Sequence, residues 1–217
     1  MSNQSGTIHS AGKDSFLKKI WRLLSRPATT ISAGLLLFAG LITGVVFWGG
    51  LNWSMEMTNT ESFCIGCHEM ENTVYQEYIE SPHYSNASGV RASCSNCHVP
   101  DEWTHKVVRK IQASREVYHK VLGSINTPEK FEAKRLELAT NVWKAMKSTD
   151  SRECRNCHEM ASMDFVLQET RASVAHSDAL DTGKTCIDCH QGIAHDLPAG
   201  AMDAYKENIS KVYDKTK

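Results

Sequence analysis

One five-residue pattern, Cys-x-x-Cys-His, occurs four times in this 217-residue chain and contains all eight of its cysteines. Two thiols with this spacing can bond the two vinyl groups of one porphyrin as thioethers, and the adjacent imidazole can ligate its iron. Paired Cys-x-x-Cys units also form disulfides and zinc sites, but neither requires the histidine that follows. The pattern therefore predicts four covalently attached c-type haems. The thioether residues would be Cys64, Cys67, Cys94, Cys97, Cys154, Cys157, Cys186 and Cys189, and the iron ligands His68, His98, His158 and His190.

The four motifs form two similar pairs. The first two motifs begin 30 residues apart and the last two 32 residues apart, and the first motif of each pair continues as Cys-x-x-Cys-His-Glu-Met. This repetition predicts two dihaem halves that arose by duplication. The thioether of Met70 could replace His68 as a ligand of haem one, because methionine is an accepted haem ligand. Met160 holds the same place in the third motif, so spacing leaves both methionines open as ligands or as packing residues.

Each iron also needs a ligand on the opposite face of its porphyrin. If the two halves are related by a pseudo-twofold axis, we expect His83 on haem four, His176 on haem two and His195 on haem three. The place equivalent to His195 in the first half is Trp103. Haem one is therefore expected to lack a distal histidine, unless His105 fills the gap.

The N-terminal part of the chain predicts a membrane anchor. No charged residue occurs from position 27 to position 55, and residues 29–50 are apolar and long enough to cross a membrane as a helix. A cleavable signal peptide has a shorter apolar region, and Phe47, Trp48 and Trp53 suit the far membrane interface. Basic residues precede this segment, so the positive-inside rule places the N-terminus in the cytoplasm and the motifs in the bacterial periplasm.

Composition and periodicity predict a mainly α fold in which a single transmembrane helix precedes a small, haem-packed domain. Apolar residues near a 3.6 period predict helices over 103–122 and 128–147, and no stretch shows strand alternation. Apolar residues make up 41% of the chain, and the net charge of −1 gives no case for nucleic acid. We expect a basic cytoplasmic tail (1–27), an anchor (28–50), a first dihaem half (51–102), a helical insert (103–150), a second dihaem half (151–200) and a polar C-terminal tail (201–217) with room for one helix.

Three stretches carry a resemblance to a known family. They are Cys64-x-x-Cys67-His68-x-Met70, the run Cys94-Ser-Asn-Cys97-His98-Val-Pro100, and the ending Cys186-Ile-Asp-Cys189-His190-Gln-Gly-Ile-Ala-His195. Together they resemble the NapC/NirT family of membrane-anchored tetrahaem quinol dehydrogenases over about residues 28–200.

This resemblance implies particular residues at the quinol site. In relatives, an acidic residue and a lysine lie beside the open face of haem one, and Glu116 and Lys110 fall at the matching positions. Relatives with the same first signature can use its methionine on haem one, which favours Met70. Some members carry histidine where this chain has Asp101, so no distal role is expected at that position. His105 and His119 are expected to be surface or hydrogen-bonding histidines.

The implied function is oxidation of menaquinol or ubiquinol at the periplasmic face of the inner membrane in anaerobic respiration. Electrons would pass along the haems to a soluble periplasmic reductase or its cytochrome subunit, most often nitrate reductase. Electron transfer would be the main role, with quinol dehydrogenation as its enzymatic step. The alternative is a small multihaem reductase that acts directly on nitrite or a similar anion at an open haem. The quinone type, the reductase and a homodimer are left open by the sequence.

Overall fold

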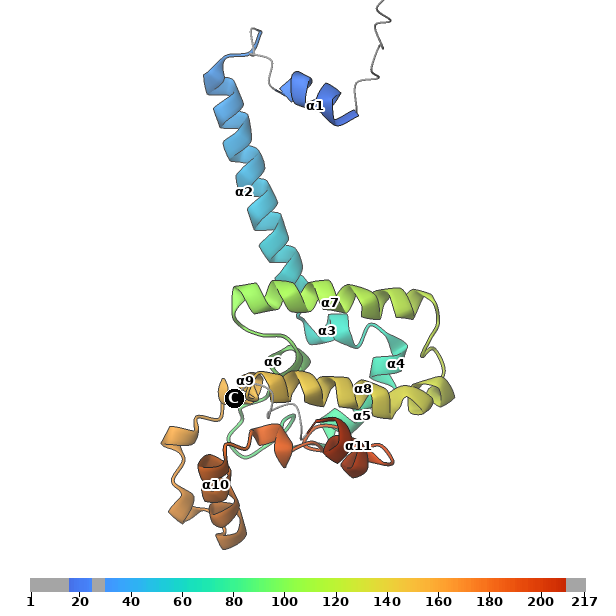
Figure 1. The fold of residues 1–217 in the computed structure, drawn as a ribbon, viewed down its shortest axis with the longest axis vertical. Coiled ribbons are helices and arrows are strands. Elements are labelled where there is room, and N and C mark those ends of the chain that lie inside the picture. Colours follow the sequence, from blue (N-terminus) through green and yellow to red (C-terminus); the bar gives the residue numbers. More distant parts are fainter. Residues whose placement is uncertain (1–15, 25–29, 210–217) are drawn as a thin grey trace, which may run out of the picture. The chain divides into compact units, whose positions relative to one another are not determined.

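The structure is a computed structural model in which residues 16–24 and 30–209 are described. These residues are mainly helical and include no strand, which confirms the predicted fold class (Figure 1). The chain divides into two compact units, residues Met1–Asn52 and Trp53–Lys217. The beginning of the predicted basic tail and the end of the predicted C-terminal tail lie outside the described residues.

The first unit holds helix α1 (Phe16–Leu24) and most of helix α2 (Ala33–Met57). In the described part of the chain, α2 is the one helix that is long and apolar enough to cross a membrane. A helix satisfies its own backbone hydrogen bonds, and the side chains of α2 are exposed from Ala33 to Gly50, as suits a lipid environment. The candidate anchor therefore extends seven residues beyond the predicted end at residue 50.

Two long helices dominate the second unit. Helix α7 (Trp103–Val121) and helix α8 (Pro128–Ser148) confirm the two predicted helices to within one residue at each end. The side chain of Thr127 accepts a hydrogen bond from the backbone of Lys130 at the start of α8, and Pro128 occupies the first turn, where its missing donor costs nothing. Gly123 ends the preceding turn with a φ of 66°, a conformation that glycine adopts without strain.

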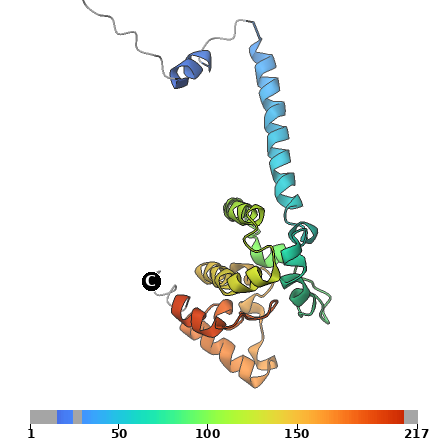
Figure 2. The same ribbon diagram turned by 90° about the vertical axis from the view of Figure 1, so that its right-hand side faces the viewer.

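Short helices surround the two long ones, and some of them carry the motifs. They are α3 (Glu61–Cys64), α4 (His68–Glu71), α5 (Val74–Ile79), α6 (Cys94–His98), α9 (Arg152–Arg155), η1 (Met160–Ser162), η2 (Phe165–Leu167), α10 (Thr170–Thr182) and η3 (Cys186–Asp188). Figures 1 and 2 show α3 and α4 on the side of α8 that faces α7, whereas α10 lies on the other side. Helix α8 thus lies between motif one and α10, the helix that carries His176.

The C-terminal region holds one further helix. Residues 201–217 were expected to form a polar tail with room for one helix, and helix α11 (Ala201–Asn208) occupies its first part and packs against α8. Ala201, Tyr205 and Ile209 recur every four residues, so they share one helix face and bury it. The core cluster consists of Trp143, Ile187, Ala201, Tyr205 and Ile209, with Ala139 and Met146 packed against it. This is a small core for the unit, in agreement with the expectation that porphyrins supply much of its apolar mass.

Candidate haem centres

Each Cys-x-x-Cys-His motif lies in a short helix or at the junction of two. Motif one joins the end of α3 to the start of α4, motif two is α6, motif three begins in α9, and motif four begins in η3. All eight thiols are free, so none of the cysteines forms a disulfide. Within the described ranges, no group of three or more His, Cys, Asp or Glu residues is arranged to hold a metal ion. Each cysteine pair is therefore available for thioether bonds.

Successive motifs lie beside one another in chain order. The thiol of Cys64 in motif one interacts with that of Cys94 in motif two, and the thiol of Cys154 interacts with that of Cys186 in motif four. Helix α6 of motif two also packs against α9 of motif three. The four motifs therefore form a continuous series from one to four.

Three motif histidines face a second histidine. The ring centroids of His98 and His195 are 6.3 Å apart, those of His83 and His158 are 6.2 Å apart, and those of His176 and His190 are 6.2 Å apart. Two imidazole nitrogens that each bind a metal at about 2 Å place their ring centroids about 6 Å apart. The residues present thus fit an iron between the rings of each pair.

These pairs correct the expected assignment of distal ligands. His83 was expected on haem four but faces motif three, His195 was expected on haem three but faces motif two, and His176 was expected on haem two but faces motif four. An exchange between the two halves holds for His83 and His195. His176 instead faces a motif of its own half, because α10 continues directly into the segment that carries motif four. The pseudo-twofold assumption therefore failed as a guide to pairing.

The paired imidazoles are held in a state suited to iron binding. Burial lowers the pKa of His98 to about 4 and also lowers the pKa of His190 and His195, so these rings are neutral and keep a lone pair at neutral pH. The Nδ1 of His195 donates to the carbonyl of Val74 at 3.1 Å, which leaves its Nε2 as the ligating atom. The Nδ1 of His176 is 2.6 Å from Oε1 of Gln168.

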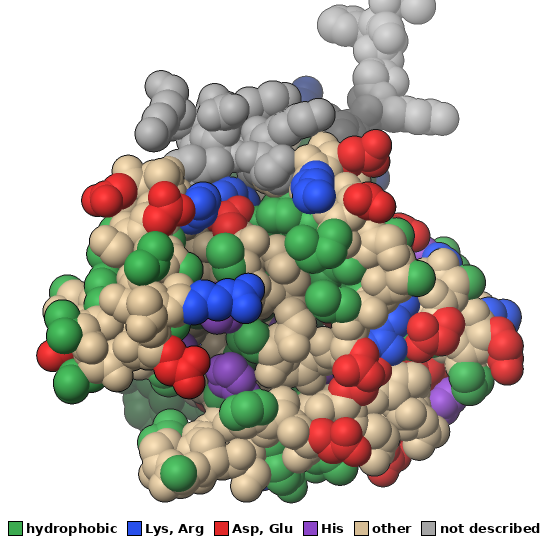
Figure 3. Space-filling view, turned by 90° about the horizontal axis from the view of Figure 1, so that it is seen from below, with side chains coloured by type: hydrophobic (Ala, Val, Ile, Leu, Met, Phe, Trp, Pro, Cys, Tyr) green, Lys and Arg blue, Asp and Glu red, His purple; other side chains and the backbone are tan. Residues whose placement is uncertain are grey.

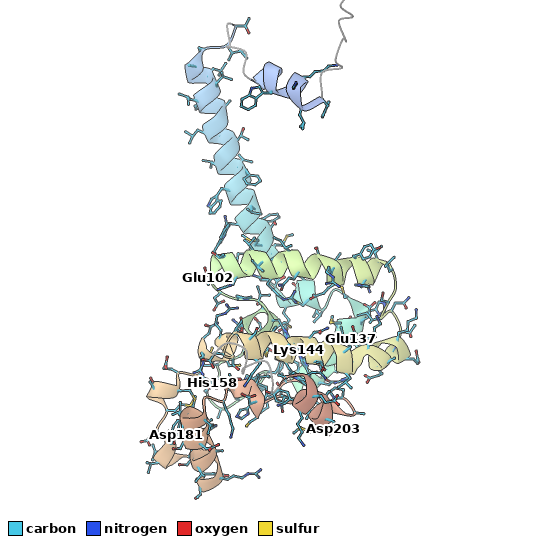
Figure 4. All side chains as sticks on the ribbon, in the orientation of Figure 1. Glu102, Glu137, Lys144, His158, Asp181 and Asp203 are labelled. Carbon is cyan, nitrogen blue, oxygen red and sulfur yellow. The ribbon has the colours of Figure 1, made fainter. Side chains whose placement is uncertain are left out.

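Two further observations concern the pair formed by His83 and His158. In the described part of the chain, the buried Nδ1 of His83 has no hydrogen-bond partner. A buried imidazole nitrogen without a partner is costly unless another group binds it. Figure 4 labels His158, the ring that faces His83, in the region between α8 and α10, and Figure 3 shows histidine side chains within a hollow of the domain surface.

Motif one differs from the other three. The Nε2 of His68 lies 3.5 Å from Oε1 of Glu69, and its side chain is 58% exposed. None of the ring contacts among the described residues involves His68, so this motif has no facing imidazole. Met70, two residues on, is partly buried. Motif one therefore differs from the other three in the arrangement of its histidine ring, and a haem one without a distal histidine stays a prediction.

Lys110 and Glu116, the two expected quinol-site residues, lie on different faces of α7. The Nζ of Lys110 donates to the carbonyl of Thr58 at 3.0 Å and to its Oγ1 at 2.9 Å, and its charge acts on Cys64 of motif one. Glu116 is exposed and forms an ion pair with Arg109 at 2.9 Å. Arg109 also donates to the carbonyl of His98 in motif two at 3.2 Å. The structure brings each residue near a motif but does not bring the two together.

The other two histidines of α7 are exposed, as expected. The Nε2 of His105 forms an ion pair with Glu102 at 3.2 Å, at the start of α7, where Figure 4 labels Glu102. The Nδ1 of His119 hydrogen-bonds to Ser124 at 3.2 Å. His105 therefore has a local partner and does not fill the gap at haem one.

Several charged contacts at the motifs escaped sequence reasoning. The carboxylate of Glu69 is 2% exposed, pairs with Lys120 of α7 and keeps one oxygen without a hydrogen bond. In motif four, Asp188 accepts hydrogen bonds from Lys147 at 2.5 Å and from Tyr205. The only available signal was position, because Glu69 directly follows motif one and Asp188 lies within motif four. Their cationic partners are 51 and 41 residues away, a separation that no local pattern reveals.

Comparison with known proteins gives a consistent set of relatives. Residues 26–200 match the NapC/NirT cytochrome c family, N-terminal region. The chain is 55% identical over 184 residues to the denitrification system component NirT of Stutzerimonas stutzeri, covering 85% of this chain and 92% of the relative. It is 57% identical over 179 residues to the cytochrome c-type protein NapC of Paracoccus pantotrophus, covering 82% and 76%. A putative tetraheme cytochrome c of Allochromatium vinosum is 50% identical over 169 residues, covering 78% and 90%. No solved structure gives a significant match.

Proposed function

The chain belongs to the NapC/NirT cytochrome c family, and from that premise we propose that it is a membrane-anchored tetrahaem cytochrome that oxidises quinol and passes the electrons to a soluble periplasmic reductase. One observation carries this proposal. Three motif histidines each face a second imidazole at 6.2 to 6.3 Å, whereas His68 of motif one faces none. An iron with two imidazole ligands is closed to substrate, so haem one is the proposed place where quinol reacts.

We assign the axial ligands from the facing imidazole pairs. His98 and His195 would hold haem two, His83 and His158 haem three, and His176 and His190 haem four. For haem one, we propose Met70 in place of His68, because the Nε2 of His68 is directed toward Glu69. When bound, each haem accepts one electron at a time. The eight cysteines would fix the four porphyrins covalently in the order in which the motifs adjoin.

Lys110 and Glu116 are the proposed quinol-site residues of the chain itself. Burial lowers the pKa of Lys110, which makes its neutral, proton-accepting form easier to reach. Oxidation of a quinol releases two protons, and a positioned side chain can accept one of them as a general base. Glu116 is exposed and pairs with Arg109, which itself donates to the carbonyl of His98. From this exposed place Glu116 could pass a proton to water. Lys110 would orient the quinol hydroxyl beside motif one.

The membrane topology follows from charge and from the apolar helix. Lys18 and Lys19 belong to the basic segment before α2, and α2 is the candidate span. By the positive-inside rule, the N-terminus would be cytoplasmic and the haem domain periplasmic, in the inner membrane of a bacterium. The reductase partner is proposed from relatives: the names NirT and NapC favour nitrogen-oxide respiration, with periplasmic nitrate reductase as the first candidate.

Reduction by quinol tests the proposal directly. The purified full chain with its haems, in detergent, is mixed with a menaquinol analogue, and haem reduction is followed by stopped-flow absorbance. Lys110→Gln should slow reduction by at least about tenfold, in line with the loss of one general base. Lys106→Gln is the matched control, because Lys106 also contacts the segment before motif one, through Glu56 at 2.7 Å. It should leave the rate within about twofold.

Two outcomes would count against the proposal. Equal rates for the Lys110→Gln variant and the unchanged protein would remove Lys110 from the site. Failure of quinol to reduce any haem, combined with nitrite turnover from an artificial donor in the absence of a partner, would favour direct anion reduction.

A further inference from the structure

Helix α7 presents three distinct faces, and one of them packs against the segment that leads into motif one. Its inner lysines contact that segment: Lys106 bonds Glu56, Lys110 bonds Thr58, and Lys120 bonds Glu69. These lysines recur at spacings that return to one side of a helix with about 3.6 residues per turn. The charged inner face is therefore fixed to residues 56–69.

A second face of α7 is apolar and exposed. Ile111 is 67% exposed, Tyr118 62% and Val121 80%. With a turn of about 100° per residue, these side chains fall on one stripe to the side of the lysine face. We call it the apolar stripe, and its members are Trp103, Val107, Ile111, Tyr118, Val121 and Leu122. It runs the length of the helix; Val107 is half-buried, and Thr104 and Ser114 are polar residues within it.

The third face is polar, and it lies on the side of the lysine face that is away from the apolar stripe. It carries His105, Arg109, Gln112, Glu116 and His119. In total the helix has five Lys or Arg residues and a single acid, Glu116. Three of these cations, Lys106, Lys110 and Lys120, bond the segment before and after motif one, and Arg109 pairs with Glu116. The membrane-binding feature of α7 is therefore its exposed apolar face opposite a polar one, the pattern of an interfacial amphipathic helix.

The contact between α7 and the end of α2 fits a place at the membrane surface. Glu56, which bonds Lys106, follows Trp53 by three residues in the same helix, a rise of about 4.5 Å. Trp53 is an aromatic residue of the kind found at the membrane–water interface, just after the apolar run of α2. The headgroup layer on each side of a bilayer is roughly 5–8 Å thick. If α2 spans the membrane with Trp53 at its interface, the rise along the same helix puts residue 56, and with it the contact to Lys106, within one headgroup layer of Trp53.

We propose that α7 is an interfacial helix whose apolar stripe lies in the boundary between lipid headgroups and acyl chains. Its polar face then meets water, and its lysine face holds motif one beside the membrane surface. This inference rests on the proposed membrane anchorage but not on quinol oxidation. A lipid surface is the occupant favoured here because the stripe is apolar and exposed, and its helix is bonded to Glu56 and Thr58, which lie at the end of the candidate span, just beyond its interfacial residue Trp53.

A single added cysteine can report on each face, because all eight native thiols are thioethers in the haem-loaded protein. We would place the cysteine at Ile111, Tyr118 or Val121 in the stripe, and at His105, Gln112 or His119 on the polar face as controls. The full chain with its haems would be incorporated in nanodiscs that contain phosphatidylglycerol, and its haem spectrum would be checked for each variant. Two reagents are then compared: a water-soluble maleimide and a photoactivatable phospholipid.

The stripe positions should react with the maleimide at least about tenfold more slowly than the polar positions, and should cross-link to the phospholipid preferentially. Equal maleimide rates on the two faces would overturn the proposal. Protection of the stripe from both reagents would also overturn it, because protein, porphyrin or a second copy would then cover it. Quinol reduction measured on the same nanodiscs separates the two proposals, since the stripe can prove to be lipid-bound even where quinol does not react.

Discussion

The three imidazole pairs differ in the angle between their ring planes. The planes of His83 and His158 are inclined at 70°, whereas those of His98 and His195 are inclined at 26° and those of His176 and His190 at 31°. Imidazole planes that are nearly parallel split the iron dπ orbitals, and planes that are nearly perpendicular leave two of them close in energy. Ring orientation, which local side-chain contacts set, should therefore distinguish haem three from haems two and four.

We predict that electron paramagnetic resonance of the oxidised protein resolves these environments. Haems two and four should give ordinary rhombic low-spin signals, and haem three a strongly anisotropic low-spin signal. Haem one, with no facing imidazole, should give a signal of its own. His83→Met should remove the anisotropic signal and leave the two rhombic signals unchanged. Four identical low-spin signals would contradict both the ring angles and the proposed asymmetry of motif one.

At the scale of elements, α8 and α11 together hold motif four. Lys147 of α8 is buried and bonds Asp188 inside the motif at 2.5 Å, and Tyr205 of α11 donates to the other carboxylate oxygen. Burial would raise the pKa of Asp188, but the hydrogen bonds from Lys147 and Tyr205 outweigh it and lower the pKa. The carboxylate is therefore charged in the folded domain and depends on its cation.

Lys147→Met should leave that carboxylate partly buried without its cation and destabilise the domain by about 3 kcal/mol. For a domain of this size the loss corresponds to a fall in Tm of roughly 6–12 °C. Circular dichroism of the haem-loaded protein during heating would measure it. Lys134→Met, an exposed position on the same helix, is the control and should change Tm by about 2 °C or less. Equal Tm values for the two variants would refute a structural role for the Lys147 contact.

At the scale of the whole domain, adjacency in chain order suggests a linear electron path. Motif one adjoins motif two, motif two adjoins motif three through α6 and α9, and motif three adjoins motif four. Haem one would receive electrons and haem four would be the last in the series. Removal of an inner haem should therefore isolate every haem beyond it.

This path can be tested by removing one haem at a time. Replacing both cysteines of motif three by alanine should leave haems one and two reducible by quinol and haem four reduced far more slowly. The same change in motif four should leave haems one, two and three reducible. Rapid-mixing absorbance of each variant gives the reduced fraction. Unimpaired reduction of haem four without haem three would show that the path is branched.

Local features of the sequence were enough to predict the elements. The 3.6 period together with Thr127, Pro128 and Gly123 set the bounds of α7 and α8, because helix formation depends on neighbours within a few residues. The Cys-x-x-Cys-His pattern predicted the haem chemistry, because both thiols and the imidazole come from five consecutive residues. The contrast between Trp103 and His195 also predicts that haem one lacks a distal histidine, which the electron paramagnetic resonance measurement would test.

Contacts between distant segments could be decided only by the tertiary structure. Which imidazole faces which motif depends on how the chain folds back over many residues, so the pairing assumed from a pseudo-twofold axis was wrong. The tertiary structure likewise decides the ion pairs of Glu69 and Asp188 and the packing of α11 against α8. Sequence periodicity predicts which side chains share a face of α7. Only the packed domain decides that the lysine face turns inward and that the apolar stripe remains exposed.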